Sequence, residues 1–420
     1  MLDAITGINE HRRAVTDHNP PQPAGSVREV FLAFLWLGLT SFGGPIAHLG
    51  YFRTEFVERR RWLSETRYAE LVTLCQFLPG PASSQVGFAL GLMRAGYLGA
   101  LAAFVAFTLP SALALVLFAL GAAWMAGPIG GGIIMGLKVV AVSIVAHAVW
   151  GMARNLCPDR ARAGIALVTV WIMLAMSGPL GPIAAIVVGA ALGLWLTASV
   201  DQPVSADVTQ ADNAAQPVSK WVGIASLSLF ALLLVGLPVL VLVNDSALLA
   251  VADAFYRAGA LVFGGGHVVL PLLQTEIVAP GWVSADAFLA GYGAAQAVPG
   301  PLFTFAAYLG TVIPTGFNPL IGATVALLAV FVPGFLLLIG VLPFWHQARQ
   351  WQPVQAALRG ANAAVVGILG AALYTPVWTS TVTDPMAFAL ALTGFVLLTV
   401  GKVPAWGVVI LAAVGGVVLL

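Results

Sequence analysis

Two stretches, "CQFLPGPASSQVGFALG" (Cys75–Gly91) and "AQAVPGPLFTFAAYLG" (Ala295–Gly310), carry the motif Pro-Gly-Pro inside apolar sequence. Proline removes a backbone donor and clashes with the preceding helical turn, whereas glycine permits a positive φ. Each stretch therefore predicts a break in an otherwise helical segment. A break that occurs twice indicates an internal repeat.

The surrounding composition is typical of an integral membrane protein. Hydrophobic residues make up 60% and charged residues 8% of the 420 residues, and the mean hydropathy is +0.96. Apolar runs of about twenty residues, the length with which a helix crosses a bilayer core, recur from residue 30 onward. The alternating segments of a transmembrane β-barrel are absent from the sequence. We therefore expect an all-α polytopic membrane protein.

The two halves of the chain correspond to each other. Phe42-Gly43-Gly44 matches Phe263-Gly264-Gly265, and Pro79-Gly80-Pro81 matches Pro299-Gly300-Pro301. Matching single residues are Trp62 with Trp282, Ser64 with Ser284, Gln76 with Gln296, Pro110 with Pro333 and Lys138 with Asn362. The offset drifts only from 220 to 224 residues, which indicates a duplication.

Hydrophobic segments divide the chain into two repeats and their connections. Six segments fall in residues 28–199, six in matching positions fall in 247–420, and one unmatched segment occupies 221–246. Residues 1–27 have the composition of a cytosolic N-terminal tail, and residues 200–220 that of a polar linker. An odd number of spans between corresponding elements turns the second repeat upside down. Two inverted-topology repeats are typical of secondary transporters.

The positions of Lys and Arg test this topology through the positive-inside rule. With the N-terminus in the cytosol, most Lys and Arg residues fall in inside connections. One cluster conflicts with simple alternation: Arg53, Arg59, Arg60, Arg61 and Arg67. The conflict disappears if the first two segments are re-entrant hairpins that fold back at Phe-Gly-Gly and Pro-Gly-Pro. The alternative is an amphipathic helix over residues 53–70 on either membrane surface.

The breaks also predict where a ligand binds. Irregular backbone at membrane depth is tolerated only where it is buried in protein or lines a cavity. A helix that restarts after a break points unpaired N–H groups and the positive end of its dipole toward that cavity, which favours an anion. The alternative is that the prolines and glycines only kink packed helices.

Polar side chains near the breaks are candidate ligand contacts, with interhelical bonding as the alternative role. Lys138 would supply positive charge or snorkel to the surface. Asp253 and Arg257, spaced i, i+4, would pair on one helix face, and Arg257 also lies near a break. His48, His147 and His267 are candidate proton carriers. The predicted substrate-binding set is Phe42, Gly43, Gly44, Gln76, Pro79, Gly80, Pro81, Ser83, Ser84, Gln85, Lys138, Arg257, Gly264, Gly265, His267, Gln296, Pro299, Gly300, Pro301, Thr304 and Asn362.

Sequence motifs of enzymes are missing. There is no nucleophile elbow, HExxH helix, Walker loop or GxGxxG fingerprint, and Gly264–His267, which looks like an esterase oxyanion loop, has no GxSxG serine to accompany it. Cys75 and Cys157 lack the spacing of a disulfide framework or metal site. We expect no catalytic residue, cofactor or metal, and an energy source in ion gradients or the membrane potential.

The sequence resembles the chromate ion transporter family, long-chain two-domain type. The likeness lies in "SFGGPIAHLGYFRTEFVERRRWLSE", "LCQFLPGPASSQVGFALG", "DAFYRAGALVFGGGHVVLPLL" and "AQAVPGPLFTFAAYLG", in this order. The resemblance implies a bacterial inner-membrane antiporter that exports chromate, confers chromate resistance and uses the proton-motive force. The implied partners are chromate, sulfate as a related anion, protons as the coupling ion and membrane lipid, without nucleic acid. Whether the protein forms a homodimer is left open.

Alternatives remain at this level. Chromate and sulfate are both tetrahedral dianions of similar size, so hydrogen-bond donors at helix ends would separate them poorly. One alternative function is uptake or exchange of sulfate or another oxyanion, and a second is an anion channel. A third, an intramembrane enzyme, has no assembled nucleophile and base in its favour. The halves differ at Pro45 against Gly266 and at Lys138 against Asn362, which predicts unequal half-sites.

Overall fold

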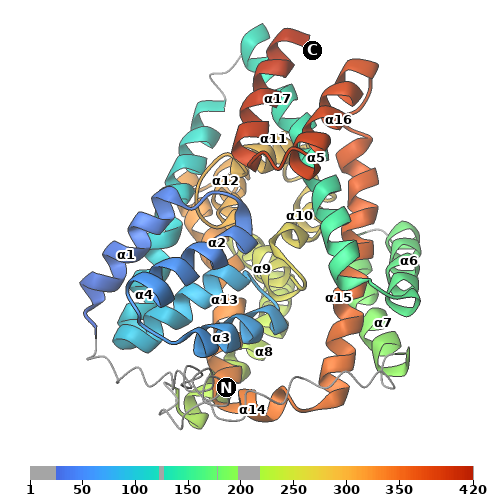
Figure 1. The fold of residues 1–420 in the computed structure, drawn as a ribbon. Coiled ribbons are helices and arrows are strands. Elements are labelled where there is room, and N and C mark those ends of the chain that lie inside the picture. The colour runs from blue at the N-terminus through green and yellow to red at the C-terminus, as the bar shows by residue number, and fades with distance from the viewer. Residues whose placement is uncertain (1–24, 123–126, 177, 197–217, 420) are drawn as a thin grey trace, which may run out of the picture.

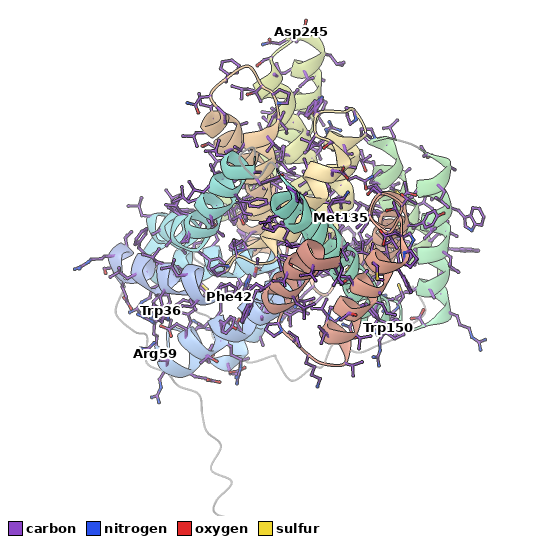
Figure 2. The ribbon with its side chains drawn as sticks, turned by 90° about the horizontal axis from the view of Figure 1, so that it is seen from above. Trp36, Phe42, Arg59, Met135, Trp150 and Asp245 are labelled. Atoms are coloured by element: carbon purple, nitrogen blue, oxygen red, sulfur yellow. The ribbon has the colours of Figure 1, made fainter. Side chains whose placement is uncertain are left out.

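The computed structural model describes residues 25–122, 127–176, 178–196 and 218–419, which form helices and no strand. The predicted N-terminal tail and the predicted linker lie almost entirely outside these residues. Many large apolar side chains face outward, including Trp36, Trp150 and Trp195, of which Figure 2 labels the first two. An apolar exterior fits contact with lipid and confirms the membrane-protein class.

Five helical stretches among the described residues are long and apolar enough to cross a membrane. They are α4 (Ala82–Ala122), α5 (Pro128–Leu156), α8 (Lys220–Val243), Pro319–Phe344, which begins with α13 (Pro319–Val341), and Gln352–Trp378, which begins with α15 (Gln352–Ala372). Helix α8 is the unmatched segment, and it packs on α13 and α9 (Ala247–Ala260).

The remaining helices recur in both repeats (Figure 1). In the first repeat they are α1 (Val27–Thr40), α2 (Gly44–Phe52), α3 (Glu65–Phe77), α6 (Arg160–Ala175) and α7 (Leu180–Leu196). Their counterparts are α9, α10 (Val269–Leu273), α11 (Ala285–Ala295), α16 (Pro385–Thr399) and α17 (Ala405–Leu419), while α12 (Phe305–Val312) matches the first part of α4. Each repeat also contains a π-helical turn after α2 or α10, η1 (Arg53–Arg59) and η4 (Gln274–Val278).

Equivalent serines begin equivalent helices. Ser64 Oγ accepts a hydrogen bond from the Arg67 amide at the start of α3 (3.4 Å), and Ser284 Oγ accepts one from the Ala287 amide at the start of α11 (3.2 Å). Ser26 and Ser246 cap α1 and α9 in the same way. Such caps satisfy N–H groups that have no acceptor within the helix, so the duplicated sequence fixes the same helix starts twice.

The two repeats interlock through small residues. Helix α5 packs against α17 of the other repeat, and α15 packs against α7. A Cβ at Gly136 of α5 would lie 2.1 Å from the Ala412 carbonyl oxygen, and one at Gly360 of α15 would lie 2.1 Å from the Gly189 carbonyl oxygen. Backbones approach this closely in membranes because packing of small residues replaces the hydrophobic effect between helices.

The chain folds back at both motifs of the first repeat. Phe34 of α1 stacks on Phe56 of η1 (centroids 4.8 Å apart), beyond the Phe-Gly-Gly break. Trp62 Nε1 donates to Glu29 Oε1 (3.1 Å), and Arg94 Nη2 lies 3.2 Å from the same carboxylate. The start of α1, the end of the first hairpin and the end of the second hairpin therefore lie together. Helix α4 turns at Ala95 and Gly96, which have non-helical backbone angles, directly after Arg94.

The second repeat folds back in the same way. Arg257 of α9 contacts Glu276 of η4 (2.8 Å) across the Phe-Gly-Gly break. The Tyr308 hydroxyl of α12 donates to the Ala287 carbonyl of α11 (2.8 Å) across the Pro-Gly-Pro break. Each repeat thus contains two helical hairpins, which is the arrangement that re-entrant segments require; the membrane face at which they enter stays a prediction.

Candidate functional site

The breaks of the two repeats meet in the middle of the molecule. The Gly80 amide donates to the Val262 carbonyl (2.7 Å), and the Gly300 amide donates to the Ser41 carbonyl (2.9 Å). Val262 and Ser41 each precede the Phe-Gly-Gly motif of their repeat. The Pro-Gly-Pro tip of each repeat is therefore hydrogen-bonded to the Phe-Gly-Gly tip of the other, and this exchange of partners is what inverted repeats predict.

Glycine is required at the centre of both Pro-Gly-Pro motifs. Gly80 has φ +123° and Gly300 has φ +96°, values that side-chain-bearing residues rarely adopt. A Cβ at Gly80 would lie 3.0 Å from Gly334 Cα, and one at Gly300 would lie 2.8 Å from Ser111 Oγ. Gly334 and Ser111 follow the matching prolines of α13 and α4, so each tip rests on the long helix of the other repeat.

At one point the two repeats contact each other through equivalent residues. Gly266 of the second repeat lies against Pro45 of the first, because a Cβ at Gly266 would be 3.1 Å from Pro45 Cγ. These residues occupy the same position in the two repeats, so this contact marks the pseudo-twofold axis. A side chain at position 266 would therefore press on the Pro45 ring.

Buried hydrogen-bond donors without a partner gather at the breaks. Ser41 Oγ and Ser84 Oγ are both buried and make no hydrogen bond, and Gln296 Nε2 is a third buried donor, directed at the Tyr292 hydroxyl. Buried polar groups are nearly always paired, so unpaired ones need a ligand or water to explain them. The N-termini of α2 and α4 begin directly after the breaks and add first-turn N–H groups that have no acceptor in the helix. This donor set suits the oxygens of an anion.

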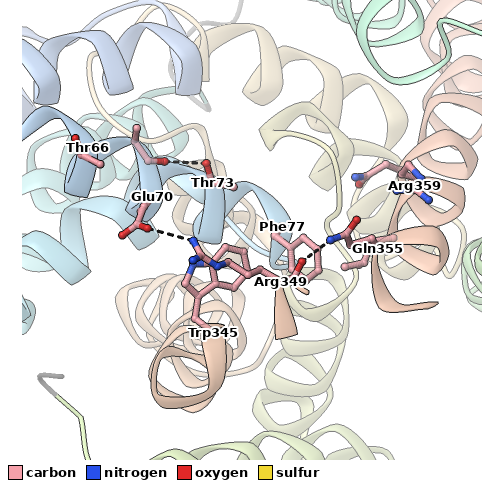
Figure 3. A pocket seen from close by; sticks show the side chains of 11 residues that line it. Thr66, Glu70, Thr73, Phe77, Trp345, Arg349, Gln355 and Arg359 are labelled. Atoms are coloured by element: carbon pink, nitrogen blue, oxygen red, sulfur yellow. Dashed lines mark hydrogen bonds and ion pairs between the residues drawn. The ribbon is translucent and has the colours of Figure 1, made fainter. Parts of the chain in front are cut away.

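A cavity of about 400 Å³ leads toward the breaks from one side. Its walls come from α3, α14 (Trp345–Ala348), the adjoining Arg349 and α15 (Figure 3). Glu70 of α3 pairs with Arg349 across it (3.2 Å). Asn362 is part of the lining, and its Oδ1 lies 3.5 Å from the position of a Cβ at Gly264. The cavity therefore reaches the Phe-Gly-Gly break of the second repeat.

The sequence profile of the chromate transporter family matches residues 28–194 and 249–417. The chain belongs to the chromate transporter family. The family's profile matches once in each half of the chain, in agreement with the duplication. No cluster of His, Cys, Asp and Glu suited to a metal ion occurs among the described residues.

Relatives share the family over most of their length. The chain is 29% identical to a probable chromate transport protein of Synechococcus elongatus, with 84% of each chain covered. It is 28% identical to chromate transport proteins of Pseudomonas aeruginosa and Cupriavidus metallidurans, covering 85% and 95% of this chain and 82% and 98% of theirs. No solved structure matches the chain.

Several predicted ligand contacts of this transporter use their donors within the protein. Gln85 Nε2 donates to the carbonyls of Pro79 (3.1 Å) and Gly334 (2.9 Å), and the Thr304 hydroxyl donates to the Pro301 carbonyl (2.7 Å). These two residues hold the shape of the Pro-Gly-Pro turns. Ser83 Oγ lies 3.4 Å from His48 Nδ1, and His267 Nδ1 lies 2.8 Å from the Tyr292 hydroxyl. Gln76 is exposed, unlike its half-buried counterpart Gln296.

Both predicted cations are paired with carboxylates. The expected pairing of Arg257 with Asp253 is present (2.8 Å), and Arg257 also binds Glu276. Lys138 binds Asp286 (2.5 Å) at the start of α11. Asp286 precedes the Gln296 break by about 15 Å of helix, at 1.5 Å per residue. The positive charge expected at the breaks is therefore balanced or distant in this conformation.

Sequence reasoning missed a repeated carboxylate. Glu55 in η1 and Glu276 in η4 occupy equivalent positions, and both are buried. Glu55 binds Arg59 and Arg60 of its own turn, whereas Glu276 takes Arg257 from α9. The signal was available in the dipeptide Thr-Glu at 54–55 and 275–276, at the repeat offset of 221.

Proposed function

We propose that this transporter exports chromate across the bacterial inner membrane by alternating access, with the oxyanion held where the four breaks meet. The observation that carries the proposal is the pair of unpartnered buried hydroxyls, Ser41 Oγ and Ser84 Oγ, beside the crossed Pro-Gly-Pro and Phe-Gly-Gly tips. Hydroxyl and amide donors together with two helix N-termini stabilise a tetrahedral dianion without a fixed cation, because each helix end carries about half a positive charge.

The charge of the substrate favours export over uptake. Moving one elementary charge through 100 mV is worth about 2.3 kcal/mol, so a dianion gains about 4.6 kcal/mol on leaving a negative cytosol. Export is therefore driven by the membrane potential, and proton influx in exchange adds to the driving force. Uptake against the same potential would need at least two co-transported protons. Export of chromate would confer resistance.

The relatives named as chromate transport proteins support chromate as the substrate. Uptake or exchange of sulfate is the second candidate, because the same donors fit a sulfate ion. An anion channel is the third candidate; saturable, gradient-coupled flux would exclude it.

Flux in inside-out vesicles tests the proposal. Chromate accumulation is measured under imposed pH and voltage gradients, with sulfate as competitor. We expect saturable accumulation that rises with an interior-positive potential. Linear, non-saturable flux would indicate a channel, and a sulfate preference would replace chromate as the substrate.

Two variants test the binding site within this assay. Ser84→Ala and Gln296→Ala should each raise the half-saturating chromate concentration about tenfold or more, because a hydrogen bond to a charged group contributes about 1.5–3 kcal/mol. Ser226→Ala on α8 removes a buried serine away from the breaks and should leave the flux unchanged. Wild-type half-saturation in both site variants would place the ligand elsewhere.

A further inference from the structure

Equivalent interfaces of the two repeats differ in one respect. Helix α11 is the counterpart of α3, and α5 is the counterpart of α15. The α5/α11 interface therefore corresponds to an α3/α15 interface on the other side. Helix α11 packs directly on α5, whereas α3 and α15 form opposite walls of the cavity. Large helix contacts elsewhere follow the repeat, since α5 with α17 matches α15 with α7, and α1 with α4 matches α9 with α13.

The α5/α11 interface is tightly closed. A Cβ at Gly293 of α11 would lie 2.2 Å from the Leu137 carbonyl oxygen of α5. Leu289 and Ala290 on α11 are 0% and 4% exposed. Beside them, Lys138 Nζ lies 2.5 Å from Asp286 Oδ1. No path to the breaks passes between these two helices.

The equivalent positions on the other side line the cavity. Asp286, Leu289, Ala290 and Gly293 correspond to Thr66, Ala69, Glu70 and Thr73 of α3, and all four of these line the cavity. Lys138 corresponds to Asn362, which lines the same cavity from α15. The residues that close the α5/α11 interface are therefore the counterparts of the residues that line the α3/α15 cavity.

We propose that the α3/α15 cavity is the entrance for the oxyanion from one membrane face, and that α5 and α11 form the matching entrance on the opposite face, held shut by the Lys138–Asp286 pair. The identity of the anion rests on the proposed function. The lining holds Arg349, Arg359 and Glu70, and because Glu70 pairs with Arg349 the entrance carries one net positive charge, which favours an anion. In the alternate state α3 packs on α15, the Lys138–Asp286 pair separates and α11 leaves α5.

Thiol accessibility tests the two entrances without any substrate. Ala69→Cys and its counterpart Leu289→Cys are compared in a Cys157→Ser background, because Cys75 is fully buried. A membrane-impermeant thiol reagent is added to each face separately. We expect Ala69→Cys to react only from the arginine-rich cytosolic face, at least tenfold faster than Leu289→Cys reacts from the outer face. Equal rates, or no reaction of Ala69→Cys, would overturn the assignment. Ala290→Cys serves as a second closed-side position in case Leu289→Cys does not fold.

Charge variants test the proposed latch. Asp286→Asn should raise the outer-face labelling of Ala290→Cys several-fold, and the exchange of Lys138→Asp with Asp286→Lys should restore slow labelling. Asp245→Asn, at an exposed aspartate near the start of α9, should have no effect (Figure 2). Unchanged labelling in Asp286→Asn would refute the latch. Because these reactions contain no anion, a preparation that shows the labelling pattern but no chromate flux would refute the proposed substrate and leave the entrances standing.

Discussion

Alanine at the crossed glycines Gly80 and Gly300 should destabilise the transporter more than alanine at glycines with open space around them. Gly80→Ala and Gly300→Ala add a Cβ at φ +123° and +96°, at 3.0 Å from Gly334 Cα and 2.8 Å from Ser111 Oγ respectively. Gly44→Ala is the matched control within a break, because it has φ +78° and nothing within 4 Å of its Cβ. Gly151→Ala, in the C-terminal part of α5 and equally open, gives the baseline.

The expected changes in the free energy of unfolding differ among these variants. A side chain at a strained positive φ costs about 1–3 kcal/mol, and overpacking against a neighbour costs about 1–3 kcal/mol. Displacement of the tip also weakens the hydrogen bond to Val262 or Ser41, worth about 0.5–1.5 kcal/mol. Gly80→Ala and Gly300→Ala should therefore lose about 2.5–7.5 kcal/mol of unfolding free energy and Gly44→Ala about 1–3 kcal/mol. Gly151→Ala should gain up to about 1 kcal/mol from helix propensity.

Thermal unfolding in detergent, followed by the loss of monodisperse protein at one scan rate, provides the measurement. Membrane proteins commonly unfold irreversibly, so the order of the midpoints is compared rather than absolute free energies. We expect Gly151→Ala highest, then Gly44→Ala, with Gly80→Ala and Gly300→Ala several degrees below. Midpoints of the two tip variants equal to that of Gly44→Ala would show that the cross-repeat contacts do not support the fold.

Two further changes have defined outcomes. Arg257→Met leaves two buried carboxylates without a counter-charge and should lower stability by about 3–5 kcal/mol, measured as the same midpoint. Arg162→Met breaks only a partly exposed pair and should lower it by less than about 1 kcal/mol; similar losses would contradict a structural role of the buried network. Gly136→Leu should abolish the α5/α17 contact, because its Cβ would lie 2.1 Å from the Ala412 carbonyl oxygen, and should reduce the yield of folded protein. Gly131→Leu, with open space around its Cβ, should express normally, and normal yield from both would argue against the interlocked packing.

The breaks were predictable because their chemistry is local. Pro-Gly-Pro and Phe-Gly-Gly interrupt a helix wherever they stand, and the constant offset shows that each occurs twice. Their partners were not predictable in the same way. The Gly80–Val262 and Gly300–Ser41 hydrogen bonds join backbone atoms far apart in the sequence. Any residue type can accept such a bond through its carbonyl, so the sequence does not indicate which residue does.

The partners of the charged residues were only partly predictable. The Asp253–Arg257 pair follows from i, i+4 spacing on one helix. Glu276, the second partner of Arg257, lies in a π-helical turn beyond a break, and Asp286, the partner of Lys138, lies on a helix of the other repeat. Helical periodicity places neither residue. The sequence predicts Lys138 as a ligand contact because it lies within a span, and Arg257 because it lies near a break; in the structure each has a carboxylate partner.

The duplication predicts two equal entrances, yet the residues at their mouths differ in charge. Lys138 faces Asp286 on one side, whereas their counterparts Asn362 and Thr66 are neutral. The state with the α5/α11 side closed thus keeps an ion pair that the opposite state lacks. Because 66% of the Asp286 side chain is exposed, this pair contributes at most about 1 kcal/mol, a factor of about five in population. A bias of that size leaves both states populated, and differential binding of the anion or of coupling protons is then sufficient to move the transporter between them.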